Sequence, residues 1–378
     1  MKLTGITVLD FTQFMTGPMV SAIMADHGAN VIKVEPPQGD PTRQGPRSLA
    51  GQNDGDTFRV LNRGKHSLVL DLKEPTHLET ARALIRDADV VLESFRPGVA
   101  DRLGIGYADA NALNPNIVYC SISAFGQIGL LKDVAAHDTM VQALAGALAI
   151  DADGRPVEPT VSLAGVAAAH FALSATLMAL LAARAGQGGD HIDISMHDAA
   201  LAVRGGATAA ALATLETPSH FAGPAVYALN ASYRTAEGRW LRVDARDRRA
   251  ATTLLEALSR PDLLPGALDA DPPAQAALSA TLTSIFAEAS LADWMHRLGL
   301  AGGVAPVLNY AEALAHPHTA SRGLIGTDTE GGKHLHSPIR FLRDPSRPDF
   351  TTPELGQHTA DSSCGRSKPW MSRSMKIP

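Results

Sequence analysis

The sequence predicts an α/β protein in which a parallel sheet forms the core of a large domain and a smaller α/β domain accompanies it. The chain has 378 residues, of which 45% are hydrophobic, so it can bury a large core and divide into two domains. In its first part, short β-branched runs alternate with segments of helical spacing, which is typical of a parallel sheet covered by helices. Beyond about residue 205 this alternation gives way to a hairpin pattern and amphipathic helices.

The expected strands of the large domain are brief and apolar, as buried parallel strands should be. They cover residues 6–10, 31–34, 67–72, 90–94 and 117–123. Helical spacing marks residues 19–27, 77–87 and 108–113 between them. No G-x-G-x-x-G turn and no Walker lysine loop follows a strand, so we expect neither a nicotinamide nor a flavin cofactor.

Residues 161–183 contain no charged side chain and are numerous enough to cross a bilayer. Small and polar residues, including His170, fill much of this segment, so its summed hydrophobicity is modest for a membrane span. We therefore interpret it as a buried, tightly packed helix and expect no membrane association. The glycines of residues 186–189 end this helix, and residues 191–196 alternate like a strand.

The second half of the chain predicts the smaller domain. Residues 233–244 form a hairpin pattern, and residues 250–258, 274–289 and 291–298 have amphipathic helical spacing. Strand-like residues 335–341 then return to the first domain. We expect a large domain in residues 1–200, a small domain in 205–315, a return in 320–360 and a poorly packed tail in 361–378.

Composition narrows the class of function. The net charge of −6, without a basic run, argues against nucleic-acid binding, which needs a concentrated positive face. Cys120 and Cys364 lie far apart, so neither a disulfide framework nor a CxxC metal site is expected. Residues 1–10 lack the build of a signal peptide. These features indicate a cytoplasmic enzyme without a metal.

Eight local motifs occur in a fixed order along the chain. They are Leu9-Asp10-Phe11-Thr12 with Gly17-Pro18, His27-Gly28-Ala29-Asn30, Gly39-Asp40-Pro41-Thr42-Arg43, Asn62-Arg63-Gly64-Lys65-His66, Phe95-Arg96-Pro97-Gly98, Ser121-Ile122-Ser123-Ala124-Phe125-Gly126, Ser195-Met196-His197-Asp198 and Leu355-Gly356-Gln357-His358-Thr359. This series resembles the family III CoA-transferases, which include the carnitine dehydratase-like CaiB/BaiF proteins and the α-methylacyl-CoA racemases. The resemblance covers about residues 3–359.

The resemblance implies a Rossmann-like large domain built from both chain ends, and two subunits threaded through each other as an interlocked homodimer. It implies that the substrates are an acyl-CoA thioester and a carboxylic acid. By similarity, the residues that line the CoA site are Phe14, Met15, Leu70, Lys73, Phe95 and Arg102.

Basic side chains in turns that follow or adjoin strands are the candidates for the phosphates of coenzyme A, because arginine matches phosphate oxygens. These residues are Arg43, Arg63, Lys65, Arg96 and Arg102. The competing interpretation is that they belong to an ordinary solvated surface.

Two positions are candidates for acid–base chemistry. His137, which is followed by Asp138, resembles a histidine that exchanges a proton with the α-carbon of the thioester in the racemase branch. The competing interpretation is a histidine that caps or forms a hydrogen bond near a helix start. Asp247 lies near the position of a racemase glutamate, and its competing interpretation is a surface carboxylate among arginines.

The sequence departs from the family at its most important position. Resemblance places the nucleophilic aspartate of the transferases at Gly165 or, aligned differently, at Ala168, and no Asp or Glu occurs between Glu158 and Asp190. We interpret the nearby His170 as a helix-packing residue rather than a replacement base.

Three hypotheses follow. In the first, the chain is a CoA-transferase that uses a carboxylate from elsewhere, such as Asp138 or Asp247. In the second, it is an acyl-CoA racemase, isomerase, dehydratase or lyase that uses His137 and Asp247. In the third, it is a non-catalytic subunit of a hetero-oligomer with a homologue that carries the aspartate.

Overall fold

The computed structural model describes residues 1–48, 53–151, 153–214, 227–269, 271–300, 303–327, 332–345 and 348–359. The chain divides into two compact units. The large unit contains Met1–Ala149, Pro156–Thr208 and the part of the chain from Leu324 onward, and the small unit contains Ile150–Arg155 and Ala209–Gly323. The expected tail at residues 361–378 lies outside the described residues.

The large unit is built on a six-stranded parallel sheet with the order β3-β2-β1-β4-β5-β6. Its strands are β1 (Thr7–Asp10), β2 (Asn30–Glu35), β3 (His66–Val69), β4 (Val90–Glu93), β5 (Val118–Ser123) and β6 (Asp190–Ser195). The α/β class with a parallel sheet is therefore confirmed. Each strand lies within three residues of the range that its apolar pattern predicted.

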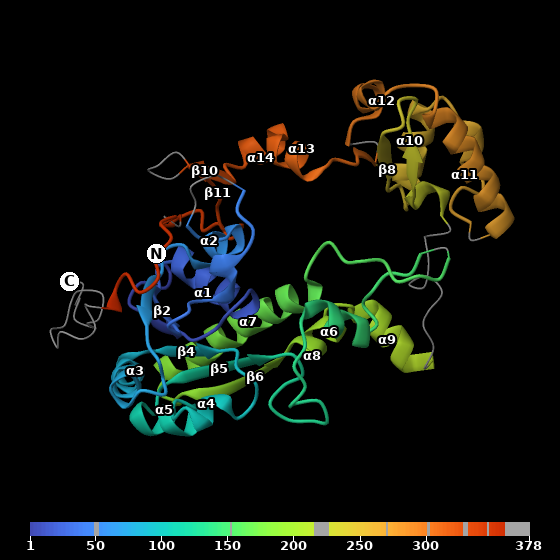
Figure 1. The fold of residues 1–378 in the computed structure, drawn as a ribbon. Coiled ribbons are helices and arrows are strands. Elements are labelled where there is room, and N and C mark those ends of the chain that lie inside the picture. The colour runs from blue at the N-terminus through green and yellow to red at the C-terminus, as the bar shows by residue number, and fades with distance from the viewer. Residues whose placement is uncertain are drawn as a thin grey trace. The chain divides into compact units, whose positions relative to one another are not determined.

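Helices cover both faces of this sheet (Figure 1). On one face, α1 (Thr16–Asp26) and α7 (Leu163–Arg184) pack over alternate strand residues such as Val8 and Val90. On the other face, α3 (Pro75–Asp87) and α5 (Tyr107–Leu113) pack over the intervening residues. The remaining helices among the described residues of this unit are α2 (Asp56–Asn62), α4 (Val99–Arg102), α6 (Asp138–Leu144), α8 (Met196–Ala202), the first residues of α9 (Gly205–Thr214) and the short 3-10 helix Pro41–Gln44.

The uncharged segment forms α7, which is long and apolar enough to cross a membrane by length and composition alone. Its Ala168, Ala169 and Ala172 are fully buried, and the helix packs against α1, α8, β5 and β6. Small side chains allow this close approach of neighbouring backbones. The side of the helix that carries these alanines belongs to the core of the α/β fold, as predicted, whereas its other side is exposed in the described chain.

The return segment pairs with the edge of the sheet. His358 donates its backbone N–H to the Ser67 carbonyl at 3.0 Å, and Val69 donates its backbone N–H to the Thr359 hydroxyl at 2.9 Å. The expected strand at residues 335–341 is wrong, because strand β11 (Lys333–Leu335) pairs only with β10 (Ile325–Thr327) and ends before this range does. Pro338 has no N–H for a ladder, and the Ser337 hydroxyl lies 3.1 Å from His27 Nε2 instead.

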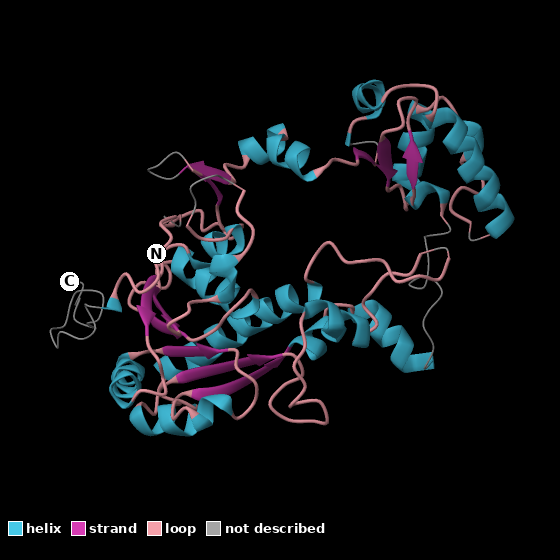
Figure 2. Ribbon diagram, in the orientation of Figure 1, coloured by secondary structure: helices cyan, strands magenta, loops and turns pink. Residues whose placement is uncertain are grey.

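The small unit has a three-stranded antiparallel sheet of β7 (Ser232–Arg234), β8 (Trp240–Val243) and β9 (Val304–Pro306) (Figure 2). Around it lie α10 (Arg248–Ala257), α11 (Pro272–Phe286) and α12 (Leu291–Leu298), followed by α13 (Tyr310–Ala315) and α14 (Pro317–Ser321). Tyr233, Phe286 and Trp294 form its core, where the ring centroids of Phe286 and Trp294 are 5.2 Å apart. The predicted hairpin is present as β7 and β8.

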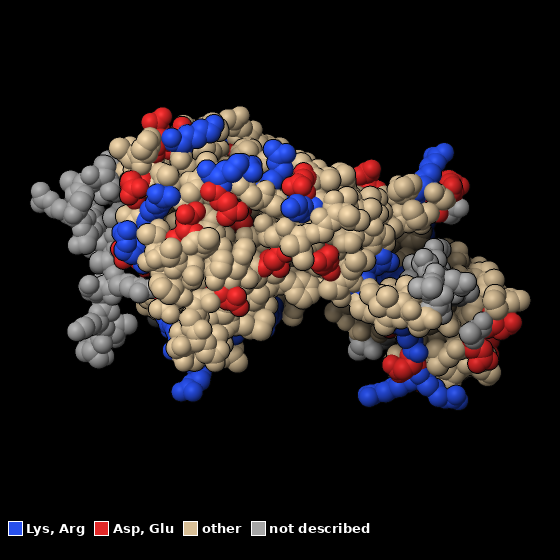
Figure 3. Space-filling view, turned by 90° about the horizontal axis from the view of Figure 1, so that it is seen from below, with Lys and Arg blue, Asp and Glu red and all other residues tan. Residues whose placement is uncertain are grey.

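Charged side chains of both signs are interspersed on the face of the molecule that Figure 3 shows. The described atoms of that face form no broad positive area of the kind that binds nucleic acid. This distribution agrees with the mildly acidic composition.

Candidate active site

The loop that follows β1, which consists of residues 11–15 and is called here the β1 loop, lies at the carboxyl end of the sheet. Strand order reverses between β1 and β4, and ligands of open α/β sheets bind at such a switch point. Within this loop Phe14 is exposed and has a φ of 65°, which is rare for a residue with a side chain. The β1 loop therefore stands where the fold favours a ligand.

A cavity of about 230 Å³ opens beside the β1 loop. Its walls come from the carboxyl ends of β1, β2, β3 and β4, and include Phe11, Gln13, Pro36 and Leu72. Three residues expected to line a CoA site, Leu70, Lys73 and Phe95, also line it. The cavity is mainly apolar, and the exposed Lys73 supplies a cation at its side.

A second group of candidates meets at the other end of the β1 loop. The rings of Phe14 and His137 are in edge contact, with centroids 5.7 Å apart. Asp138 follows His137 as the first residue of α6, and its Oδ1 accepts the backbone N–H of Gly165 at 2.7 Å. Its Oδ2 accepts the side-chain amide of the buried Gln142, which also donates to the Val161 carbonyl at 3.1 Å. These contacts fix the Asp138 carboxylate against the first turn of α7.

Gly165 leaves little space for a side chain. A Cβ at this position would lie 2.7 Å from Met15 Cε, 2.9 Å from Thr16 Oγ1 and 3.4 Å from Asp138 Oδ1. Ala168, the alternative position, is fully buried and packs with Ala167 and Ala199. The structure thus brings Gly165 to the group of Phe14, Met15, His137 and Asp138, whereas Ala168 belongs to the core.

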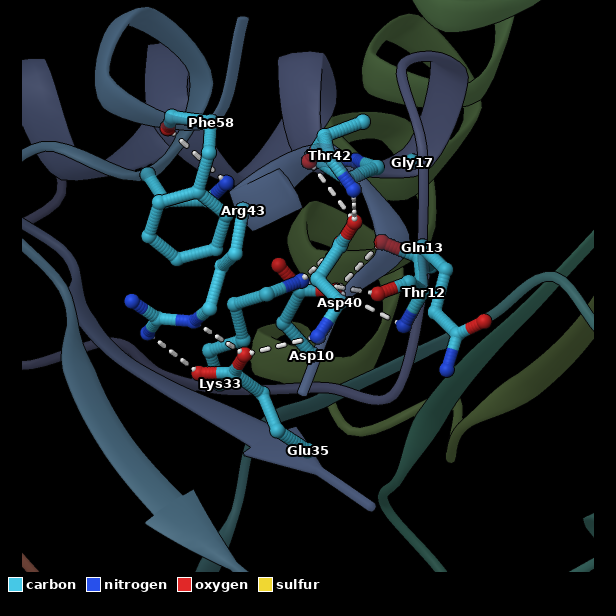
Figure 4. A network of polar contacts seen from close by, with 12 residues as sticks. Asp10, Thr12, Gln13, Gly17, Lys33, Glu35, Asp40, Thr42, Arg43 and Phe58 are labelled. Carbon is cyan, nitrogen blue, oxygen red and sulfur yellow. Dashed lines mark hydrogen bonds and ion pairs between the residues drawn. The ribbon is translucent and has the colours of Figure 1, made fainter. Parts of the chain in front are cut away.

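Three of the predicted phosphate ligands are buried in internal ion pairs (Figure 4 shows that of Arg43). Arg43 binds both oxygens of Glu35 at 2.8 Å, pairs with Asp54 at 2.9 Å and lies over the Phe58 ring. Because its fork is already occupied by carboxylates, Arg43 has a structural role within the fold.

Arg63 and Lys65 are held in the same way. Arg63 pairs with Asp26 at 2.5 Å, and Lys65 donates to Asp10 at 3.0 Å and to Asn62 at 2.8 Å. Burial lowers the pKa of Lys65 to about 8, although the Asp10 carboxylate favours the charged form. Arg63 and Lys65 therefore also pair with buried carboxylates inside the large unit.

The other two predicted arginines are placed differently. Arg96 and Arg102 are exposed, and each is the chain neighbour of a residue that lines the cavity, Phe95 and Leu103 respectively. Neither forms an ion pair within the described part of the chain. Their guanidinium groups are therefore accessible to a ligand.

Asp247 and His170 have local roles. Asp247 lies in the small unit, where its carboxylate accepts the Ala250 N–H at 2.9 Å and caps the start of α10. His170 is exposed on α7, with its Nδ1 2.8 Å from the Val166 carbonyl. Its exposure in the described chain differs from the packing role that we expected.

Sequence reasoning missed Glu93, the buried last residue of β4. Its carboxylate accepts the Phe95 N–H at 2.8 Å and so fixes a wall of the cavity. Burial raises the pKa of Glu93 to about 7, reinforced by the carboxylates of Asp101 and Asp193 and opposed by the Ser121 hydroxyl and the Phe95 N–H. A carboxylate that ends a wholly apolar strand was the available signal.

Comparison with known proteins identifies the family. Residues 3–359 match CoA-transferase family III. Acetyl-CoA:oxalate CoA-transferase of Acetobacter aceti is 33% identical over 338 residues, which cover 85% of this chain and 84% of that protein. Alpha-methylacyl-CoA racemase of Homo sapiens is 31% identical over 379 residues, which cover 96% and 92% of the two chains.

Comparison with solved structures points to the same family. A CAIB/BAIF family protein from Brucella suis has a crystal structure that matches with a TM-score of 0.84 and 28% identity, over 95% of this chain and 97% of that one. This likeness includes both units of the chain. The protein therefore belongs to CoA-transferase family III and is an enzyme that handles acyl-CoA thioesters.

Proposed function

We propose that this protein transfers coenzyme A from an acyl-CoA thioester to a carboxylic acid, with Asp138 as the carboxylate that forms the covalent intermediates. The observation that carries the proposal is the position of Asp138, whose Oδ1 binds the Gly165 N–H beside Met15. The side chain missing at residue 165 is thus replaced, in space, by a carboxylate from α6.

The chemistry needs no reactant beyond the two substrates. A carboxylate oxygen of Asp138 attacks the thioester carbon, so that a C–O bond forms, the C–S bond breaks and CoA leaves as a thiolate. The thiolate then attacks the aspartyl carbonyl, which releases the first acid as a carboxylate and leaves Asp138 as a CoA thioester. The incoming carboxylate attacks this thioester and expels the thiolate again. Attack of the thiolate on the incoming acyl group gives the new acyl-CoA and regenerates Asp138.

The cavity suits the adenine end of coenzyme A. Phe11, Phe95 and the two prolines Pro36 and Pro37 offer flat apolar walls, and Lys73 lies beside them. Arg96 and Arg102 are the exposed cations near this wall that would meet phosphate groups. The pantetheine arm would then follow the β1 loop toward Phe14, Met15 and Asp138.

We also propose an interlocked homodimer in the cytoplasm. On α7, the side chains of Phe171, Met178 and Leu181 are exposed in the described chain, although the opposite side of the helix is buried. A second copy of the chain would cover this apolar face. Light scattering of the purified protein tests the dimer, and a monomer at micromolar concentration would contradict it.

Hydroxylamine trapping tests the reaction. The enzyme is incubated with acetyl-CoA or succinyl-CoA, treated with hydroxylamine and analysed by peptide mass spectrometry. A hydroxamate at Asp138, absent in Asp138→Asn and retained in Asp247→Asn, is the expected result. Absence of an adduct with either thioester, together with absence of transfer, would overturn the proposal.

One observation favours the alternative hypothesis of a racemase, isomerase, dehydratase or lyase: His137 is exposed and lies beside Phe14. It predicts deuterium exchange at the α- or β-carbon of the thioester that disappears in His137→Ala. Transfer activity that arises only when an aspartate-bearing homologue is added would instead identify this chain as a subunit of a hetero-oligomer.

A further inference from the structure

Three consecutive side chains of the β1 loop serve different parts of the candidate site. Gln13 lines the cavity, Phe14 contacts His137, and the end of the Met15 side chain fills the space that a Cβ on Gly165 would occupy. A shift of this short segment would therefore change the surroundings of Asp138, where we place the thioester and which we call the thioester end of the site. It would not rebuild the cavity, most of whose walls come from other segments.

The conformation of the β1 loop is not one that its residues favour by themselves. Phe14 has a φ of 65°, in the left-handed region where a Cβ is crowded. Such a residue persists only when the surrounding structure holds it there. The groups that hold the loop are therefore informative about its function.

The main anchor is Thr12, which is fully buried. Asp10 Oδ1 accepts both the backbone N–H of Thr12 at 2.9 Å and its hydroxyl at 2.5 Å. The ammonium group of Lys33 donates to the Thr12 carbonyl at 2.9 Å and pairs with Asp40 at 3.0 Å. Asp10, Lys33 and Asp40 are likewise fully buried, and Figure 4 shows them gathered around Thr12.

Packing adds to these hydrogen bonds. A Cβ on Gly17 would lie only 2.3 Å from Thr12 Cβ, so the start of α1 closes directly onto the threonine side chain. Beyond Thr12, Gln13 donates its N–H to the Ser94 hydroxyl at 3.2 Å, and the Met15 carbonyl accepts the Met19 N–H at 2.9 Å. Phe14 thus lies between two residues, Gln13 and Met15, whose backbone groups are fixed by hydrogen bonds.

We propose that Thr12 is a positioning residue, through which the buried groups Asp10, Lys33 and Asp40 fix Phe14 and Met15 at the thioester end of the site. This inference rests on the proposed function for its kinetic consequence. Loss of the Thr12 hydroxyl lowers kcat, because the chemical step needs reacting groups in register. It leaves the affinity for CoA largely unchanged, because most cavity walls do not depend on this hydroxyl.

Ser21 provides a matched control. Its hydroxyl donates to the other oxygen of the same carboxylate, Asp10 Oδ2, at 2.5 Å, and it is also fully buried. Ser21 lies on α1 and not in the β1 loop. Thr12→Val and Ser21→Ala therefore each remove one hydroxyl donor from Asp10, but only the first change removes a contact that holds the β1 loop.

The experiment compares the full-length wild type with Thr12→Val, Thr12→Ser and Ser21→Ala. Transfer from succinyl-CoA or acetyl-CoA gives kcat and KM, calorimetry gives the CoA dissociation constant, and thermal unfolding gives stability. We expect kcat to fall about tenfold or more in Thr12→Val, to stay near wild type in Ser21→Ala, and to be rescued in Thr12→Ser. Equal losses of kcat in Thr12→Val and Ser21→Ala at similar stability would overturn the proposal.

Two measures keep the test decisive. If Thr12→Val does not fold, Thr12→Cys keeps a weak donor of similar size and should reduce kcat in the same direction. Hydrogen exchange of residues 11–18 needs no activity, and should be faster in Thr12→Val than in Ser21→Ala. Absence of acyl transfer in the wild type would refute the proposed function alone, whereas equal exchange in the two variants would refute the role of Thr12.

Discussion

Asp138 and Gly165 meet where the first turns of α6 and α7 come together, with 2.7 Å between the Asp138 Oδ1 and the Gly165 nitrogen. The two positions are 27 residues apart in the sequence. Family resemblance expects a carboxylate at Gly165, and the fold brings the Asp138 carboxylate from α6 against the backbone N–H of this residue.

Gly165→Asp should not create a better enzyme. The new Cβ would lie 2.7 Å from Met15 Cε, and the new carboxylate would stand beside that of Asp138. Overpacking of this kind typically costs about 1–3 kcal/mol, and like charges add to it. We expect lower transfer activity and a lower melting temperature. Gly165→Ala tests the packing alone and should be milder, because the end of the Met15 side chain can move. A rise in kcat for Gly165→Asp would show that the site needs its carboxylate on α7.

Glu93→Gln should change how stability depends on pH. The pKa of Glu93 is raised from 4.5 to about 7, so the folded protein keeps a proton that the unfolded chain releases. The free energy of unfolding therefore falls as the pH rises from 4.5 to about 7, by about 3 kcal/mol in total. Glutamine removes this loss while its amide oxygen still accepts the Phe95 N–H. Urea unfolding from pH 5 to pH 8 should show a flatter profile for the variant and a gain above pH 7. If the stability of the variant and of the wild type depended on pH in the same way, the raised pKa of Glu93 would be contradicted.

Leu72→Trp should obstruct the cavity. Leu72 lines the 230 Å³ space, and the indole ring would occupy volume that we assign to the adenine of coenzyme A. We expect CoA affinity to fall by about tenfold or more, equivalent to about 1.4 kcal/mol. Titration calorimetry measures the affinity. Val60→Trp, at an exposed position of α2, is the control and should bind CoA like the wild type. Unchanged binding in Leu72→Trp would place the nucleotide elsewhere.

Arg43→Ala should destabilise the fold more than it weakens CoA binding. Its removal leaves Glu35 and Asp54 without their cation, and breaking a buried pair costs about 3–5 kcal/mol. Arg96→Ala, by contrast, removes an exposed cation and should weaken CoA binding and its salt dependence without affecting unfolding. Denaturant unfolding and calorimetry on both variants distinguish the two roles. The opposite pattern, with a stable Arg43→Ala that no longer binds CoA, would make Arg43 a phosphate ligand.

Residue patterns were sufficient for much of the fold. The β-branched runs located the strands of the sheet because a buried parallel strand must be apolar on both faces. One predicted strand, at the described residues 335–341, is absent although several of its residues are apolar, because Pro338 within it has no backbone N–H for a sheet. The sequence could also have predicted that Asp247 caps a helix, because aspartate is a common cap directly before a helical segment.

The site was harder to predict, because a charged residue in a turn has the same appearance whether it faces a ligand or a buried partner. Arg63 and Lys65 precede β3 as Arg96 follows β4, yet their partners Asp26 and Asp10 come from α1 and β1. Pairing of this kind depends on which helices and strands pack together. Local sequence does not contain that information.

The sequence by itself determined the α/β class, the family resemblance and the absence of a carboxylate at residue 165, because these depend on residue type and local order. Only the tertiary structure decided that Asp138 stands beside that glycine, that three of the five candidate cations are internal, and that one short loop joins the cavity to the surroundings of Asp138 and Gly165. Such outcomes follow from the register of strands and the packing of helices, which bring together residues that are distant in the chain.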